Sequence, residues 1–156
     1  MVAQLLSNRL LEPYLLSPER TAQAQLLKLV INSVINPVTA AFNCKNGALL
    51  DLSYEPIMQL LVKEAGAIVR ALLPDMPAKD VYSDMVLNRA VLEVARLTAQ
   101  NTSSMLQDVQ SGRPTEIDYI NGYFVTQGKK LGLPSKYHAE MIERVKSMEG
   151  RRPPSV

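Results

Sequence analysis

The chain has 156 residues, of which 47% are hydrophobic and 21% are charged, and its formal net charge is only +2. This composition is typical of one globular domain and excludes disordered and fibrous classes. Its bases are scattered apart from two Lys or Arg pairs, no apolar run approaches the roughly 20 residues of a membrane span, and the N-terminus has no secretory pattern, so we expect no nucleic-acid partner and no membrane.

The first strong helix signal opens at Ser17-Pro18-Glu19, and strand signals are nearly absent from the whole chain. Serine can cap a helix, proline suits its first position, and glutamate favours the positive end of the helix dipole. The helical period then runs to about Asn43. Because Pro37 lies inside this helix and lacks a backbone N–H, we expect a kink or a local break near Ile35-Asn36.

Further helices are predicted over residues 54–72, 79–100, 105–110, 116–131 and 135–148. Ser53 and Thr115 are expected to cap the first and the fourth of these. The expected buried stripe of the 79–100 helix is Val81, Met85, Val86, Ala90, Val91, Val94 and Leu97. We therefore expect an all-α bundle of five to six helices, forming one domain over 1–156 with its core in 17–149.

A line of polar residues interrupts the otherwise apolar 17–43 helix. Its members recur every three or four positions and share one face: Lys28, Asn32, Asn36, Thr39 and Asn43. Asparagine is a weak helix former, but its amide offers donors and an acceptor to a ligand with hydroxyl and carboxylate oxygens. Two interpretations stay open: a ligand-facing line, or a seam that faces solvent or hydrogen-bonds to neighbouring helices.

Lys28 also has two interpretations. Its aliphatic stem can lie on apolar neighbours while the ammonium reaches solvent. Alternatively, a partly desolvated lysine among Leu27, Leu29 and Ile31 is suited to giving or taking a proton near neutral pH.

A second group of candidate residues lies at later helix boundaries. Ser103 and Ser104 occupy a break between helices, where hydroxyls cap and backbone N–H groups can receive an anion. Glu116 follows Thr115 and, with Asp118, can simply stabilise a helix start. Gly122 falls inside a helical pattern and is interpreted as a site of close helix packing.

Cysteine, histidine and glycine usage excludes several kinds of site. The single cysteine, Cys44, can form no internal disulfide and indicates a reducing compartment, with the cytosol as the expected location. Cys44 and His138 lie far apart in the sequence, and we interpret both as structural, with no metal site. No glycine-rich dinucleotide fingerprint follows a strand, so we expect no complete cofactor site in this chain.

Two long motifs resemble the signatures of the ketopantoate reductase (2-dehydropantoate 2-reductase) family. The first is KLVIN at 28–32, INPVTA at 35–40 and NCKNG at 43–47; the second is NTSSMLQD at 101–108 and TEIDYING at 115–122. The resemblance covers about residues 25–149. It implies the helical C-terminal, substrate-binding domain of a two-domain reductase similar to 6-phosphogluconate dehydrogenase, with the N-terminal Rossmann NADP-binding domain absent from this chain.

The resemblance also implies a reaction and roles for particular residues. The family reduces 2-dehydropantoate to pantoate with NADPH, on the way to pantothenate and coenzyme A, so the expected partners are a small 2-keto acid and a Rossmann domain. Lys28 would protonate the ketone oxygen and Glu116 would orient the substrate through its hydroxyl. The expected substrate-binding residues are Asn32, Asn36, Ser104 and Asn101. NADPH would be bound mainly by the N-terminal domain, so the isolated chain is expected to be inactive.

Two alternatives remain beside this interpretation. One is a non-enzymatic helical module that keeps the family fold for homodimerisation or for pairing with a partner chain. The other is a reductase of the same superfamily that acts on a different 2-keto acid.

Overall fold

The computed structural model describes residues 18–73 and 82–150, and within these ranges it contains six α-helices, two short 3₁₀ helices and no strand. The elements in chain order are α2 (Pro18–Phe42), η1 (Asn46–Leu50), η2 (Leu52–Tyr54), α3 (Glu55–Leu72), α4 (Asp84–Leu97), α5 (Ser104–Gln110), α6 (Ile117–Leu131) and α7 (Lys136–Lys146). The expected all-α bundle is confirmed.

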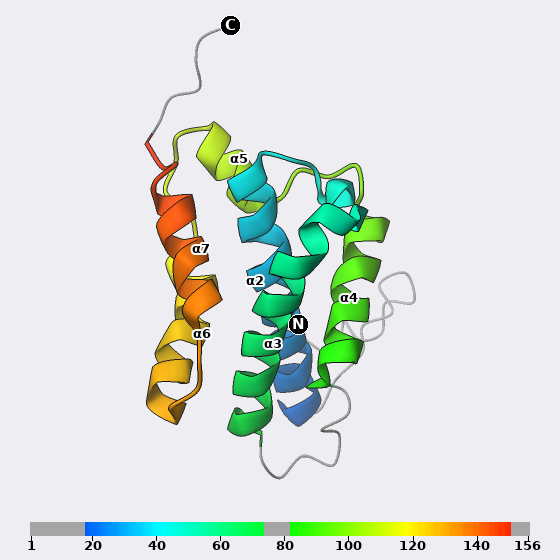
Figure 1. Cartoon of the computed structure of the whole chain (residues 1–156), viewed down its shortest axis with the longest axis vertical. Coiled ribbons are helices and arrows are strands. Elements are labelled where there is room, and N and C mark those ends of the chain that lie inside the picture. The colour runs from blue at the N-terminus through cyan, green and yellow to red at the C-terminus, as the bar shows by residue number, and fades with distance from the viewer. Residues whose placement is uncertain (1–17, 74–81, 151–156) are drawn as a thin grey trace, which may run out of the picture.

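Helix α2 is the central element of the bundle. It contacts α3, α4, α5, α6 and α7, and Figure 1 shows α6 and α7 on one side of the α2–α3 pair and α4 on the other. Residues 21–42 are long and apolar enough to cross a membrane, but more than half of this segment is buried inside the protein. Packing against five other helices therefore accounts for the apolar surface of α2.

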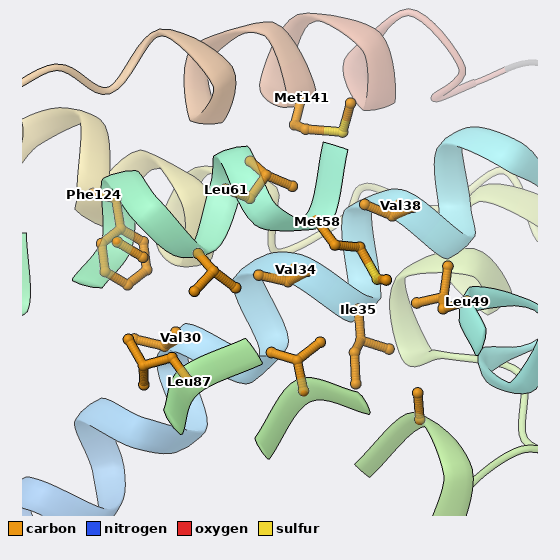
Figure 2. Packing of buried hydrophobic residues seen from close by; sticks show 14 of the residues in the cluster. Val30, Val34, Ile35, Val38, Leu49, Met58, Leu61, Leu87, Phe124 and Met141 are labelled. Atoms are coloured by element: carbon orange, nitrogen blue, oxygen red, sulfur yellow. The ribbon is translucent and has the colours of Figure 1, made fainter. Parts of the chain in front are cut away.

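The main core lies where α2 meets α3, α4, α6 and α7 (Figure 2). Val30, Val34 and Val38 recur every four residues and form the buried face of α2. The largest buried side chains from the other helices include Leu61, Leu87, Phe124 and Met141. A second cluster joins Ala40 of α2 to apolar residues of α5, α6 and α7. The two clusters leave one long edge of α2 outside the core.

Near Pro37 a kink or a local break was expected, and the break does not occur, since α2 is continuous from Pro18 to Phe42. The expected cap of α3 was wrong. Ser53 does not cap α3; it lies in η2, whose start is capped by the Asp51 side chain accepting from the Ser53 N–H at 2.8 Å. Glu116 directly precedes α6, but the expected cap from Thr115 is present in part, because its hydroxyl accepts from the Ile117 N–H at 3.4 Å.

The buried stripe expected for the third helix was largely wrong. Helix α4 buries Leu87, Val91 and Ala95, whereas Met85 is 79% exposed and Leu97 is 69% exposed. Apolar residues occur on both faces of α4, so its period could not show which face meets α2 and α3. Val81, another expected member, lies outside the described residues.

Close packing occurs at a different glycine from the expected one. A Cβ at Gly122 would meet nothing closer than 3.9 Å, so this position is not crowded. At Gly47 a Cβ would lie 2.9 Å from the Ala99 carbonyl oxygen, because the backbones of η1 and the α4–α5 connection meet there. The Gly47 N–H donates to the same oxygen at 3.1 Å. Glycine is therefore required at 47 by close backbone approach.

Candidate functional site

Three of the sequence-predicted site residues lie along the edge of α2 that the core leaves uncovered. Lys28 is exposed, and Asn32 and Asn36 are half-buried. Because they are spaced by four residues, their side chains follow one another along the helix at intervals of about 6 Å. The line thus presents one ammonium and two amides at the edge of a buried helix, as the sequence predicted.

Thr39 belongs to the same line in the sequence but not to an accessible surface. It is fully buried, and its hydroxyl lies 2.8 Å from the Ile35 carbonyl and 2.7 Å from the Ser103 hydroxyl. A carbonyl can only accept, so Thr39 donates to it and receives the proton of Ser103. The alternative in which polar residues fix helix packing therefore applies to Thr39.

Asn43 ends the line at the C-terminus of α2. Its φ of 49° is left-handed, a conformation that asparagine tolerates after a helix. Its Oδ1 accepts from Gln110 of α5 at 3.0 Å. Asn43 thus ends α2 and links it to α5 by a hydrogen bond.

The two adjacent serines before α5 have different environments. Ser103 is buried and caps α5, accepting from the Leu106 N–H at 3.2 Å. Ser104, the first residue of α5, is exposed. Asn101 is also exposed, and its carbonyl accepts from the Asn46 N–H at 3.1 Å. Of the two hydroxyls, only that of Ser104 faces outward.

Glu116 lies at the start of α6 without capping it. It is exposed, and its side chain makes no hydrogen bond to the helix N-terminus. The preceding residue, Thr115, donates through its N–H and hydroxyl to Glu149 at 2.9 and 2.6 Å, which fixes the backbone there. Asp118 forms an ion pair with Lys146 at 2.6 Å. The carboxylate of Glu116 therefore remains available to a ligand where that of Asp118 is engaged.

The fold brings the neighbours of these side chains to one hydrophobic cluster. Met105, next to Ser104, and Ile117, next to Glu116, are buried together with Ala40 of α2, and Leu29, next to Lys28, packs against them. Among the described residues, no hydrogen bond or ion pair directly joins any two of the six predicted side chains. The predicted side chains thus belong to helices that pack against one another, α2, α5 and α6, or to the residues just before them.

Two cavities found among the described residues contain no predicted site residue. The larger, of about 650 Å³, lies between α4 and the η1–α3 segment and is lined by Leu50, Leu52, Met85 and Leu92 among others. The smaller, of about 300 Å³, lies beside Glu64 and Tyr137. Site residues that form a face and not a pocket are suited to one wall of a cleft.

A buried polar network that was not predicted from the sequence lies next to Lys28, Asn32 and Asn36, which together form the α2 line. Asn121 Nδ2 of α6 donates to the Ser33 carbonyl and to His138 Nδ1, each at 3.0 Å, and His138 Nε2 donates to the Leu61 carbonyl at 3.1 Å. Burial lowers the pKa of His138 to about 4, so the ring is neutral and can accept at Nδ1. The one available signal was Pro37, which leaves the Ser33 carbonyl without its helical donor.

Glu64 of α3 was likewise missed. Its buried carboxylate accepts from the N–H groups of Tyr137 and His138 at 3.0 and 3.1 Å, so it caps α7 from another helix. Ser135, which precedes α7, supplies no side-chain cap. A carboxylate at a helix N-terminus also complements the helix dipole.

The remaining polar groups support no other chemistry in the described residues. Burial raises the pKa of the half-buried Cys44 thiol, which disfavours the nucleophilic thiolate. No group of three or more potential metal ligands occurs in this part of the chain. The structural interpretation of Cys44 and His138 is therefore supported.

The described residues contain no Rossmann-type dinucleotide site. In that fold the pyrophosphate is bound by a glycine-rich turn between a strand and a helix, and the described residues form no strand. Gly47 and Gly128 are instead crowded by neighbouring protein atoms, and Gly122 lies within α6. We assign no cofactor contact to these residues.

Sequence comparison identifies close relatives of the chain. Residues 20–149 match the family model described as ketopantoate reductase PanE/ApbA C terminal. The chain is 37% identical over 142 residues to a 2-dehydropantoate 2-reductase of Vibrio cholerae and 39% identical over 122 residues to that of Escherichia coli O157:H7. These alignments cover 91% and 78% of the chain, but only 46% and 38% of the relatives. The chain thus spans less than half the length of the curated relatives it matches.

Solved structures give the same assignment for the fold. A probable 2-dehydropantoate 2-reductase of Bacillus subtilis superposes with a TM-score of 0.69 at 33% identity, over 79% of this chain and 39% of that one. A PanE/ApbA family ketopantoate reductase of Ralstonia eutropha gives the same TM-score at 26% identity, over 80% and 40%. Since the family model covers most of the chain, the protein belongs to the ketopantoate reductase family, in the part that corresponds to the family's C-terminal domain.

Proposed function

We propose that this chain is the substrate-binding part of a 2-dehydropantoate 2-reductase and holds the 2-keto acid on the α2–α5–α6 face. The observation that carries the proposal is the line of the exposed Lys28 and the half-buried Asn32 and Asn36 on α2, together with an exposed Glu116 carboxylate that does not cap α6. The likeness to named reductases over most of the chain supports it.

Each residue has a chemical task in this proposal. Reduction of the ketone develops negative charge on its oxygen, and the ammonium of Lys28 stabilises that charge and protonates the oxygen. The amides of Asn32 and Asn36, with the Ser104 hydroxyl and the Asn101 amide beside them, hydrogen-bond the substrate's carboxylate and carbonyl oxygens. Glu116 accepts a hydrogen bond from the substrate hydroxyl and so fixes its orientation.

The proposal assigns NADPH to a Rossmann domain of the complete reductase, which would close over the face and act in the cytosol. We expect the 156-residue chain alone to bind pantoate without oxidising NADPH in the presence of 2-dehydropantoate. Steady loss of NADPH absorbance with the purified chain would contradict this division of tasks.

Calorimetric titration of the chain with pantoate tests the site. Lys28→Met and Glu116→Gln should each weaken binding at least about tenfold, because a hydrogen bond to a charged group contributes about 1.5–3 kcal/mol. Lys63→Met and Asp118→Asn are matched controls, since Lys63 is exposed on α3 and Asp118 is paired with Lys146. Equal losses in all four variants, or no binding by the parent chain, would overturn the proposal.

The identity of the 2-keto acid is tested by a second titration. Pantoate should bind more tightly than its analogue without the terminal hydroxyl, and Glu116→Gln should abolish that difference. A preference for the analogue would indicate a reductase for a different 2-keto acid.

A second candidate function is a non-enzymatic helical interaction module, and the larger groove favours it. Exposed Leu50, Leu52, Met85 and Leu92 line that groove, and such gathered apolar surface is typical of interaction sites. Its η1–α3 wall carries the acidic Asp51 and Glu55, and its α4 wall carries Arg89 and a pair of Arg96 with Glu93 at 2.7 Å, so that wall is net basic. A second copy related by a two-fold axis would place opposite charges together, so this candidate is a homodimer.

Sedimentation of the chain over a range of concentrations tests the module. The candidate predicts a dimer that Met85→Glu dissociates while pantoate binding stays absent. A monomer at all concentrations would eliminate it.

A further inference from the structure

Pro37 leaves one backbone carbonyl in the middle of α2 without its helical hydrogen-bond donor. In a regular helix the N–H of residue 37 would donate to the carbonyl of Ser33, four residues earlier, but proline has no N–H. Ser33 is fully buried, so water cannot supply the missing donor. This carbonyl lies in the turn between Asn32 and Asn36, the two amides of the α2 line.

Asn121 of α6 supplies that donor across the bundle. Its Nδ2 lies 3.0 Å from the Ser33 carbonyl oxygen, and the side chain is fully buried. The helix continues through Pro37, so the bond replaces the lost helical one where a kink or a local break was expected. α6 begins at Ile117, directly after Glu116, so one short segment joins the carboxylate of the proposed site to the turn that bears its amides.

The orientation of the Asn121 amide is fixed from its other side. Its second hydrogen points to His138 Nδ1 at 3.0 Å, and His138 Nε2 donates to the Leu61 carbonyl of α3 at 3.1 Å. A flipped amide would direct Oδ1 at the Ser33 carbonyl and at an imidazole nitrogen that has no proton, both of which repel it. The Oδ1 atom has no partner among the described residues, so the two donated bonds alone set the orientation.

We propose that Asn121 is a positioning residue for the reaction: by bonding the carbonyl that Pro37 leaves open, it sets the turn of α2 that aims Asn32 and Asn36 at the substrate. The proposal rests on the proposed function, since it concerns the same site. Asn121 does not touch the substrate; it acts through the α2 backbone.

A double-mutant cycle with Pro37 tests this role. Pro37→Ala restores an N–H that can reach the Ser33 carbonyl, so Asn121 should no longer be needed there. Asn121→Ala should weaken pantoate binding about tenfold in the parent chain but less than about threefold in the Pro37→Ala background, a coupling typical of residues that share a partner. The side-chain amide NMR signals of Asn32 and Asn36 should shift in Asn121→Ala and return in the double variant.

Glu64→Gln is the matched control, because it weakens a buried cap at the start of α7 but leaves both side-chain bonds of Asn121. It should lower stability while leaving the Asn36 amide signal and the affinity nearly unchanged. If Asn121→Ala alone does not fold, a folded and binding Pro37→Ala/Asn121→Ala chain still supports the proposal. Equal losses from Asn121→Ala in both backgrounds, or an unfolded double variant, would overturn it.

The amide signals separate this proposal from the assignment of function. If the parent chain binds no pantoate, the proposed function fails. Shifts of Asn32 and Asn36 that depend jointly on residues 37 and 121 would still establish that Asn121 sets the turn, whatever ligand the face binds.

Discussion

His138 is the only histidine of the chain, and it is buried between an amide nitrogen and a carbonyl oxygen. Removing it from solvent disfavours the charged ring, which lowers its pKa from 6.5 to about 4. In the unfolded chain the ring takes up a proton near pH 6.5, whereas in the folded chain it does so only near pH 4. The folded state is therefore destabilised as the pH falls through this interval, and above it the effect vanishes.

This difference predicts the pH dependence of stability. The free energy of unfolding should fall by about 2 kcal/mol between pH 7 and pH 5, because over most of that range only the unfolded state binds the extra proton. Urea denaturation at the two pH values measures it. His138→Gln should remove most of the dependence, and an equally steep fall in that variant would show that other groups cause it.

Residue type alone indicated some features of the site but not others. The regular spacing of Lys28, Asn32 and Asn36 was visible because helix periodicity relates neighbouring turns. The bond from Asn121 to Ser33 joins residues 88 positions apart. A pattern of neighbouring residues cannot predict a contact over that separation. Thr39 was assigned to the same line because periodicity shows on which face of the helix a residue lies. It does not show whether a neighbouring helix buries that residue.

At the scale of elements, Glu64 joins α3 to the start of α7. Its buried carboxylate accepts two backbone N–H groups that nothing else caps. Sequence patterns predict a cap at the residue next to a helix, so a cap from a different helix could not be predicted. The buried face of α4 could not be predicted either, because Leu87 and Met85 are both apolar and only the packing distinguishes them.

Glu64→Gln should lower the free energy of unfolding by about 1–3 kcal/mol, because the amide has one acceptor oxygen and turns an NH₂ group toward a backbone donor. Denaturant titration provides the measurement. Glu140→Gln is the control: Glu140 is exposed and 3.6 Å from Lys136, so its change should stay within about 0.5 kcal/mol. Equal effects of the two substitutions would contradict the cap.

Two glycine substitutions test the packing of the elements. Gly47→Ala should destabilise the fold by about 1–3 kcal/mol, because its Cβ would press on the backbone of Ala99. Gly122→Ala should be neutral or stabilising by up to about 1 kcal/mol, since alanine is the better helix former and has room there. Thermal unfolding ranks the variants, and the opposite order would show that the η1 contact is not close in solution.

At the scale of the whole molecule, the bundle forms around one helix, α2, that serves both the core and the proposed site. Its valines face α3, α4, α6 and α7, while Lys28, Asn32 and Asn36 follow the edge that remains. The fold class could be predicted because apolar periodicity and helix-breaking residues act locally. The packing of α5 and α6 against α2 depends on contacts between residues far apart in the sequence, and only the resemblance to a family indicated it in advance.

The predicted site residues lie on the surface of the bundle. They line neither of the two cavities described above, and Lys28, Ser104 and Glu116 are exposed. The same geometry limits affinity, because a ligand on an open face buries less surface than one in a pocket.

Residue-resolved amide NMR of the chain during titration with pantoate tests whether these residues bind the substrate. The signals of Lys28, Asn32, Asn36, Ser104 and Glu116 should shift together along one binding curve, while those of Met85 and Leu92 in the groove remain unchanged. Shifts confined to the groove, or an unchanged spectrum at saturating pantoate, would contradict this prediction.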